Sequence, residues 1–157
     1  MGYASRFCMV SLVIAAAACD VGGWSWDEVA RVRSPDGSRD AVLVERNGGA
    51  TTSFGYEVFV VTHGAPVRDG APGAVASLYA ATRNEQAYGV NLRWLSRDSL
   101  AVEYLRAREA IVRDAALSHR QDHLRVAMRA GVADAKAPSG GMLYNQEHAK
   151  AGKPDDR

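Results

Sequence analysis

The sequence predicts an α+β fold that is mainly β: a small antiparallel sheet of about five to seven strands, one short helix and a disordered C-terminal tail. Between residues 28 and 131, runs of alternating apolar and polar residues are separated by turn residues, which is typical of a β-rich domain. One segment, 108–118, instead repeats apolar residues at helical spacing. Residues 132–157 have almost no apolar periodicity, so burial would not offset the entropy lost on ordering.

Residues 1–18 are expected to be a removable leader. Arg6 precedes a largely apolar stretch, Phe7–Ala18, which at twelve residues is shorter than the roughly 20 that a helix needs to cross a bilayer. Small residues then lead to Cys19. This layout resembles the signal peptide of a bacterial lipoprotein, which implies cleavage before Cys19 and a lipid on its thiol. The protein would then be held at the cell membrane, facing the periplasm or the exterior.

The count of cysteines agrees with lipid attachment. Cys8 lies in the leader, so the mature chain keeps only Cys19 and cannot form an internal disulfide. Acylation would remove this unpaired thiol. Asp20 follows the cysteine, and in enterobacteria such a residue is associated with retention at the inner membrane.

An ordinary signal peptidase is the alternative. The lipoprotein pattern usually has leucine where Ala16 stands, and the run of small residues also suits ordinary cleavage. The product would then be a soluble periplasmic protein, a hydrolase or a hydrolase inhibitor. A third possibility is a cytoplasmic protein whose true start lies elsewhere, which would leave the apolar stretch exposed or packed as a helix.

Charge and length limit the possible partners. Removing 18 leader residues from the 157-residue chain leaves 139, enough for one domain. The mature chain has 18 basic and 18 acidic residues, because only Arg6 of the 19 basic residues is lost. Nucleic-acid binding depends on an excess of basic residues, so no nucleic-acid partner is expected.

Residues 19–27 are predicted to be a tether between the lipid and a β-rich domain that spans 28–131. Gly22 and Gly23 favour flexibility. Trp24 and Trp26 follow, and they can be interpreted in two ways. In one interpretation they lie at the headgroup level of the membrane. In the other they cover the edge of a small sheet, and the large apolar area of tryptophan favours this second interpretation.

The first expected strands are 40–46 and 54–62. The second has apolar residues on both faces, with Tyr56 and Val58 on one and Phe59 and Val61 on the other, which indicates a central, well-covered strand. Farther along, 89–95 and 99–105 alternate cleanly. Because only Ser96–Asp98 joins them, a hairpin is expected.

The last expected elements are a helix and a strand. In 108–118, Ile111, Val112, Ala115 and Ala116 recur at helical spacing, with charges on the opposite side. One amphipathic helix packed on the sheet would explain this pattern. Residues 122–130 alternate again and predict a further strand.

Two short motifs are similar to those of known proteins. Ser34-Pro35-Asp36-Gly37 has the residues of a tight turn, and Arg46–Thr52 reads R-N-G-G-A-T-T between two expected strands. Together with the leader, these motifs resemble a family of short bacterial lipoproteins that is itself of unknown function. The resemblance covers residues 29–104. It implies an envelope protein with a small β-rich domain, and it implies no reaction.

Four groups of polar residues have backbone or side-chain groups that could form a site. Residues 48–53 offer backbone N–H groups to an anion, but they lack the lysine of a phosphate loop, so a plain hairpin loop is favoured. His119 and His123 have metal-ligand spacing without an evident third ligand. The carboxylates that would suit acid–base chemistry are Asp27, Glu28, Glu103, Glu109 and Asp114, and Glu103 is expected to face solvent. Ser53, His63 and Asp69 complete a triad on paper, but no nucleophile elbow is present.

The expected function is that of a binding or interaction module without catalytic activity. No catalytic, cofactor or metal site is predicted, and Cys19 is the one predicted site of modification. The expected partners are the membrane, through the lipid, and an envelope protein.

Overall fold

The structure, a computed structural model, describes residues 24–113 and 123–134, and all the regular secondary structure in these ranges is β. The strands are β1 (Ser25–Arg33), β2 (Arg39–Asn47), β3 (Gly55–Thr62), β4 (Ala76–Tyr79), β5 (Arg83–Asn84), β6 (Ala87–Tyr88), β7 (Val90–Ser96), β8 (Ser99–Tyr104), β9 (Glu109–Val112) and β10 (Arg125–Ala130).

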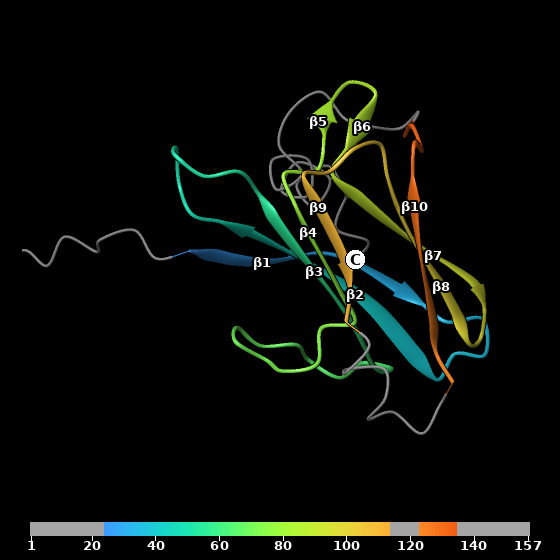
Figure 1. The fold of residues 1–157 in the computed structure, drawn as a ribbon. Helices are drawn as coiled ribbons and strands as arrows, with labels where there is room; N and C mark the ends of the chain where they lie inside the picture. The colour runs from blue at the N-terminus through green and yellow to red at the C-terminus, as the bar shows by residue number, and fades with distance from the viewer. Residues whose placement is uncertain (1–23, 114–122, 135–157) are drawn as a thin grey trace, which may run out of the picture.

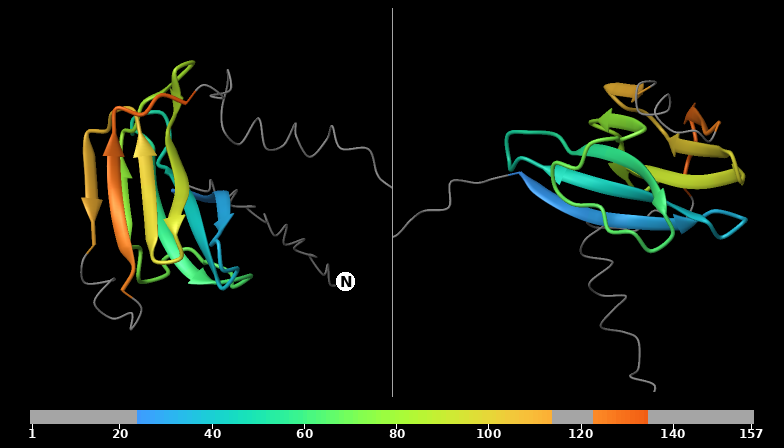
Figure 2. Two further views of the ribbon diagram at one scale, coloured as in Figure 1. Left: turned by 90° about the vertical axis from the view of Figure 1, so that its right-hand side faces the viewer. Right: turned by 90° about the horizontal axis from the view of Figure 1, so that it is seen from below.

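The strands form two facing sheets and a short ribbon (Figure 1). The larger sheet is antiparallel, in the order β1-β2-β3-β4-β9, and the smaller one has the order β10-β8-β7. β5 and β6 form the ribbon. The sheets approach each other at both sides, where β9 lies beside β10 and β1 beside β7 (Figure 2). At the second of these corners Trp94 Nε1 on β7 donates a hydrogen bond of 2.9 Å to the Val32 carbonyl on β1.

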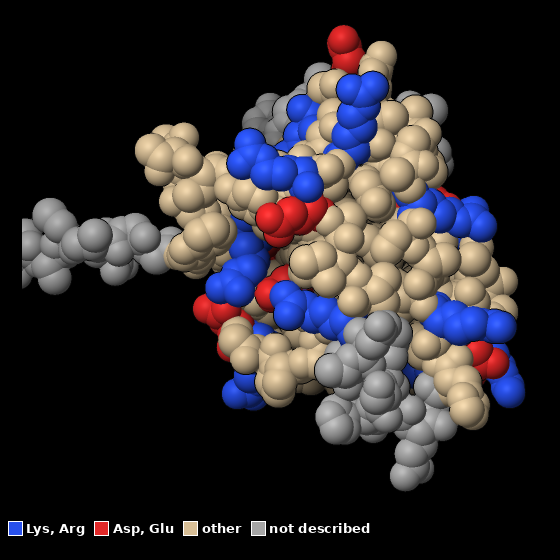
Figure 3. Space-filling view, viewed as in Figure 1, with Lys and Arg blue, Asp and Glu red and all other residues tan. Residues whose placement is uncertain are grey.

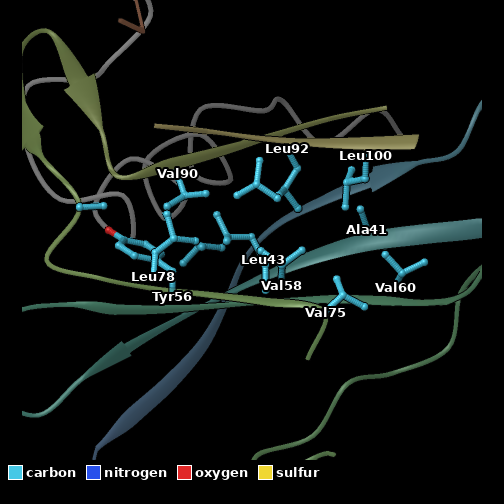
Figure 4. Close-up of a cluster of buried hydrophobic side chains, with 14 of the residues drawn as sticks. Ala41, Leu43, Tyr56, Val58, Val60, Val75, Leu78, Val90, Leu92 and Leu100 are labelled. Carbon is cyan, nitrogen blue, oxygen red and sulfur yellow. The ribbon is translucent and has the colours of Figure 1, made fainter. Parts of the chain in front are cut away.

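The main core lies between the two sheets. Alternate residues of β2 and β3, such as Leu43 and Val58, point inward and meet Val90, Leu92 and Leu100 from the smaller sheet (Figure 4). Val90, Leu92 and Leu100 are inward-facing positions that alternation in the sequence predicts. Burying them removes apolar surface from water, which is the main stabilising contribution to such a domain.

The outer face of the larger sheet is covered over only part of its area. The loop between β3 and β4 folds across one end, where Val67, Ala71 and Ala74 pack on Val42 and Phe59. This second cluster explains why β3 is apolar on both faces. The other end of the outer face has no such cover from the described residues, and it contains the groove described below.

The Ser34–Gly37 turn forms as predicted. The Gly37 N–H donates 2.9 Å to the Ser34 carbonyl, and Gly37 has φ +75°, which glycine adopts without strain. Asp36 accepts hydrogen bonds from the Ser34 and Ser38 hydroxyls at 2.7 and 2.9 Å. These hydrogen bonds, with that of the Ser38 N–H, lower the pKa of Asp36 to about 2.

The mainly β, antiparallel character is confirmed, but the described residues contain no helix. Residues Glu109–Val112, the first part of the expected helix, form β9 and pair with β4. Residues 114–122, which hold its second half, lie outside the described residues. A four-residue segment with adjacent Ile111 and Val112 is compatible with both the 3.6-residue period of a helix and the two-residue period of a strand. It forms a strand because it hydrogen-bonds to the edge of β4.

The number and direction of strands also differ from the prediction. The described residues form ten strands in three sheets instead of about five to seven in one. β10 pairs with β8 in parallel, with Val126 opposite Leu100, whereas an antiparallel sheet was expected. Alternation fixes which face of a strand is buried, but it carries no information on direction.

The domain boundaries are slightly wider than expected. β1 begins at Ser25, so the last residues assigned to the tether are paired in the sheet. At the other end, the Val132 and Asp134 N–H groups donate to the carbonyls of Tyr104 and Gln86. The rest of the expected tail, 135–157, lies outside the described residues, as do residues 1–23. Over the described ranges, the chain forms no helix with the length and apolar character needed to span a membrane.

Candidate functional site

A groove of about 290 Å³ lies on the uncovered part of the outer face. Its floor is low because two neighbouring strands carry small residues there, Gly55 on β3 and Ser77 on β4. A Cβ atom built on Gly55 would meet only Arg46 Cβ at 3.7 Å and two carbonyl oxygens at 4.0 Å. The groove is therefore open space above a glycine rather than a gap between poorly packed strands.

One wall of the groove is formed by Trp24 and Arg46. The indole of Trp24 packs so closely on Gly48 that an added Cβ would lie 2.9 Å from Trp24 Cε2 and 2.8 Å from Thr52 Oγ1. The loop between β2 and β3 thus holds the ring in place. The side chain of Arg46 lies 5.9 Å from the centre of a Trp24 ring, within cation–π range. Trp24 remains half exposed.

The opposite wall is formed by Tyr79, Glu109 and Ile111. The Tyr79 hydroxyl accepts a hydrogen bond of 3.2 Å from the Ser53 N–H, which fixes the ring. The Arg108 guanidinium lies 5.9 Å from the centre of the same ring. Ile111 is half exposed, like Trp24. Two of the three exposed large apolar side chains of the described residues therefore face one groove.

The charges around the groove are balanced. Arg46 lies 3.6 Å from Glu57 and 3.9 Å from Asp69, and Arg113 donates to the Ser77 hydroxyl at 3.3 Å. In Figure 3, basic and acidic side chains alternate over β3, β4 and β9. Among the described residues in and around the groove, the basic and acidic side chains are three arginines and three carboxylic acids: Arg46, Arg108, Arg113, Glu57, Asp69 and Glu109.

A buried polar cluster lies on the other face of the same strands. Glu45 on β2 is opposite Asp27 on β1 and Tyr56 on β3, and it is 1% exposed. Arg83 Nη1 lies 3.4 Å from Glu45 Oε1, and the guanidinium stacks 3.5 Å from the centre of the Phe54 ring. Glu45 Oε2 and the Tyr56 hydroxyl are buried without a hydrogen-bond partner among the described residues.

Burial dominates the acid–base properties of this cluster. It raises the pKa of Glu45, and the nearby positive charge of Arg83 only partly opposes this effect. Burial also raises the pKa of Tyr56 above its ordinary value, reinforced by the charge of Glu45. The cluster is closed inside the core, so it acts on stability and does not present a reacting group to a ligand.

A second buried carboxylate, Asp40, lies at the opposite end of β2. It accepts hydrogen bonds of 2.9 Å from Arg31 Nη1, from His63 Nδ1 and from the Gly64 N–H. Because a carboxylate only accepts, His63 carries its proton on Nδ1. Burial alone would raise the pKa of Asp40, but Gly64, His63 and Arg31 together lower it well below its usual range.

Substitution of Asp40 is expected to change the dependence of stability on pH. The lowered pKa means that Asp40 stabilises the fold above its unfolded pKa of about 3.9, and that this contribution is lost as the pH falls through its folded pKa. Asp40→Asn should therefore cost about 1.5–3 kcal/mol at pH 7. The difference from wild type should narrow below about pH 4.

Urea unfolding at several pH values measures this difference. Thr51→Ala, a change at an exposed residue that removes no ionisable group, serves as the control and should show a constant difference. A difference for Asp40→Asn that does not narrow in acid would contradict the prediction.

The structure does not bring Ser53, His63 and Asp69 together as a catalytic triad. Ser53 and His63 lie at opposite ends of β3, and His63 bonds Asp40 instead of Asp69. Asp69 lies beside Arg46. Gly49 N–H bonds the Asn47 side chain at 2.9 Å within an ordinary hairpin loop.

The acid–base candidates are dispersed. Glu28 pairs with Arg31 at 2.7 Å, and Glu109 lines the groove. Glu103 lies on the outer face of the smaller sheet, away from the core, but its side chain is only 13% exposed, because Arg93 on β7 and Arg129 on β10 lie on either side of it. Their positive charges compensate for a carboxylate in the middle strand of the smaller sheet.

Three predicted positions, Cys19, His119 and Asp114, lie outside the described residues. Among the described ones, no three His, Cys, Asp or Glu side chains lie close enough to share a metal ion.

Sequence reasoning missed the groove and Glu45. Glu45 has the same phase along β2 as Ala41 and Leu43, so alternation alone places it on the buried face. The groove had no comparable signal, because Gly55 and Ser77 are far apart in the chain and become neighbours only through the register of β3 and β4.

Comparisons with protein-family models, with curated proteins and with solved structures find no match to this chain.

Proposed function

We propose that this chain is a lipid-anchored protein of the bacterial cell envelope that binds an envelope component in the outer-face groove and has no catalytic activity of its own. The leader and its resemblance to short lipoproteins of unknown function support the anchor, and Asp20 favours the inner membrane. The observation that carries the binding role is the open groove with fixed aromatic walls.

The position of the groove fits this role. Trp24 lies five residues after Cys19, and five residues span at most about 17 Å. A lipid on Cys19 would therefore hold the groove close to the membrane surface. Ligand sites in proteins are typically concave and lined by apolar or aromatic groups with a few polar ones, as this groove is.

The anchor is tested by feeding a palmitate analogue to bacteria that express the full chain, followed by fractionation and mass spectrometry of the N-terminal peptide. Wild type should incorporate the label, start at Cys19 and need detergent for release. Cys19→Ala should lose essentially all label, because its thiol is the expected acyl acceptor.

Cys8→Ala is the matched control, because Cys8 lies in the expected leader, and it should label like wild type. Label that persists in Cys19→Ala would contradict the anchor. Recovery of wild type in osmotic-shock fluid would favour the soluble periplasmic alternative.

A further inference from the structure

We propose that the outer-face groove binds an uncharged carbohydrate, with a sugar ring lying between Trp24 and Tyr79 above Gly55. This inference rests on the proposed binding role of the groove and names the chemical class of its ligand.

The walls and floor of the groove fit the shape of a sugar ring. A pyranose presents C–H groups on its faces and hydroxyl groups around its rim, so it needs flat apolar walls and polar groups at the edges. Trp24 and Tyr79 supply aromatic rings that the protein itself fixes, through Gly48 and through the Ser53 N–H. Rings that are already immobilised lose little conformational entropy when a ligand arrives.

The polar groups of the groove fit hydroxyls better than they fit an anion. Each hydroxyl both donates and accepts a hydrogen bond, which requires acceptors and donors side by side. Glu57 and Glu109 accept, Arg46 donates, and Ser77 does both. An anionic ligand would favour an excess of arginine, but the three arginines around this groove are equalled in number by carboxylates, and Arg46 lies beside two of them.

The volume limits the ligand to a small number of rings. At about 290 Å³ the groove is at the lower end of the size range of ligand pockets, roughly 300–1,000 Å³. It is open to solvent along one side of the sheet, so one sugar unit of a longer chain can occupy it while the rest extends outward.

The test uses the full chain, purified in a detergent without a sugar headgroup, and a panel of uncharged oligosaccharides. The panel contains chitotriose, cellotriose and maltotriose. Binding is followed by isothermal titration calorimetry and by tryptophan fluorescence, since Trp24 is the most exposed tryptophan of the described residues. We expect at least one member of the panel to bind and to shift the tryptophan emission to the blue.

Two variants then locate the binding. Gly55→Val fills the floor, and its Cβ makes only ordinary contacts, so the fold should be retained. Trp24→Ala removes one wall outside both buried clusters. Trp24→Ala should weaken binding at least about tenfold, the effect of losing one stacking contact and its burial, and Gly55→Val should weaken it at least as much, because the added side chain occupies the space of the sugar ring.

Ala130→Val is the matched control, since it adds similar bulk at an exposed strand position of the smaller sheet. It should leave the Kd within about twofold, which is a small change in binding free energy. Circular dichroism melts check that each variant is folded. If Gly55→Val unfolds, the result for Trp24→Ala decides.

Three outcomes would overturn the inference: no binding by any saccharide of the panel, binding that both groove variants retain, or binding that Ala130→Val loses equally. The saccharide panel does not bear on the acyl mass at Cys19 or on the membrane fractionation. A negative panel would therefore contradict the ligand class without contradicting the anchor.

Discussion

Arg83→Met is expected to destabilise the domain by about 3–5 kcal/mol at pH 7, the usual effect of removing one partner of a buried ion pair. Arg83 lies 3.4 Å from Glu45, which is 1% exposed. Without the guanidinium, the carboxylate would stay in the core without a counter charge, opposite Asp27 on the next strand. The variant would also lose the stacking of Arg83 on Phe54 and Tyr88. The effect is measured by urea unfolding.

The double variant Arg83→Met with Glu45→Gln separates the buried charge from the lost packing. Because it has no ionised carboxylate at position 45, it should recover about half or more of the lost stability. Glu45→Gln alone reports the effect of the amide in the presence of Arg83. A double variant as unstable as Arg83→Met would show that the loss comes from packing and not from charge.

The response of Arg83→Met to pH follows from the raised pKa of Glu45. A carboxyl group whose folded pKa exceeds its unfolded value destabilises the fold as the pH rises above the unfolded value. Removing Arg83 takes away the charge that opposes this rise. The difference between the variant and wild type should therefore be largest near neutral pH and should narrow as acid protonates Glu45.

Gly89→Ala is expected to cost about 2–5 kcal/mol, through a left-handed backbone at about 1–2 kcal/mol and overpacking at about 1–3 kcal/mol. Gly89 has φ +76°, and a Cβ there would lie 2.5 Å from the Tyr56 hydroxyl and 2.8 Å from Tyr56 Cζ. The Tyr56 ring is held between the two sheets and cannot simply move away (Figure 4). Thermal and urea unfolding measure the loss.

Tyr56→Phe tests the cause. The hydroxyl is buried without a hydrogen-bond partner among the described residues, so this substitution alone should change stability by less than about 1 kcal/mol. Combined with Gly89→Ala it should restore part of the loss, since the closest contact disappears while that with Cζ remains. Gly64→Ala is a matched control, because Gly64 also has φ +76° but nothing lies within 4 Å of its Cβ. Equal losses at positions 64 and 89 would refute the steric explanation.

The strands that the sequence predicted correctly are those whose own residues carry the signal, through a pattern of apolar and polar residues within the strand. β7 and β8 alternate over six or more residues and bury the expected face, whereas β2 forms on the expected β-branched run and β3 is covered on both faces, as its apolar residues predict. Residues 109–112 were predicted as the first part of a helix over 108–118, but they form β9, because they pair with the edge of β4 and this neighbour is distant in sequence. The direction of β10 depends on a neighbour that is distant in sequence.

The candidate site was less predictable than the fold, for the same reason. The sequence predicted that Trp24 lies at the membrane headgroups or covers a sheet edge. Its role as a wall of the groove depends on the close approach of Gly48, which no local pattern reveals. The hollow itself arises because the register places Gly55 opposite Tyr79 and Ser77 opposite Glu57, so that the two small residues are diagonal neighbours on β3 and β4. Such a site is a property of register, and register becomes visible only when the strands are paired.

The parallel pairing of β10 with β8 has a consequence for biosynthesis. During translation, β1–β4 can pair as soon as they leave the ribosome, because each lies next to its predecessor in the sheet. The edge of β8, by contrast, has to wait for residues 125–130, which follow it in the chain only after β9. Until then its backbone N–H and C=O groups are open to another chain. A nascent or prematurely terminated product that ends before β10 is therefore expected to aggregate.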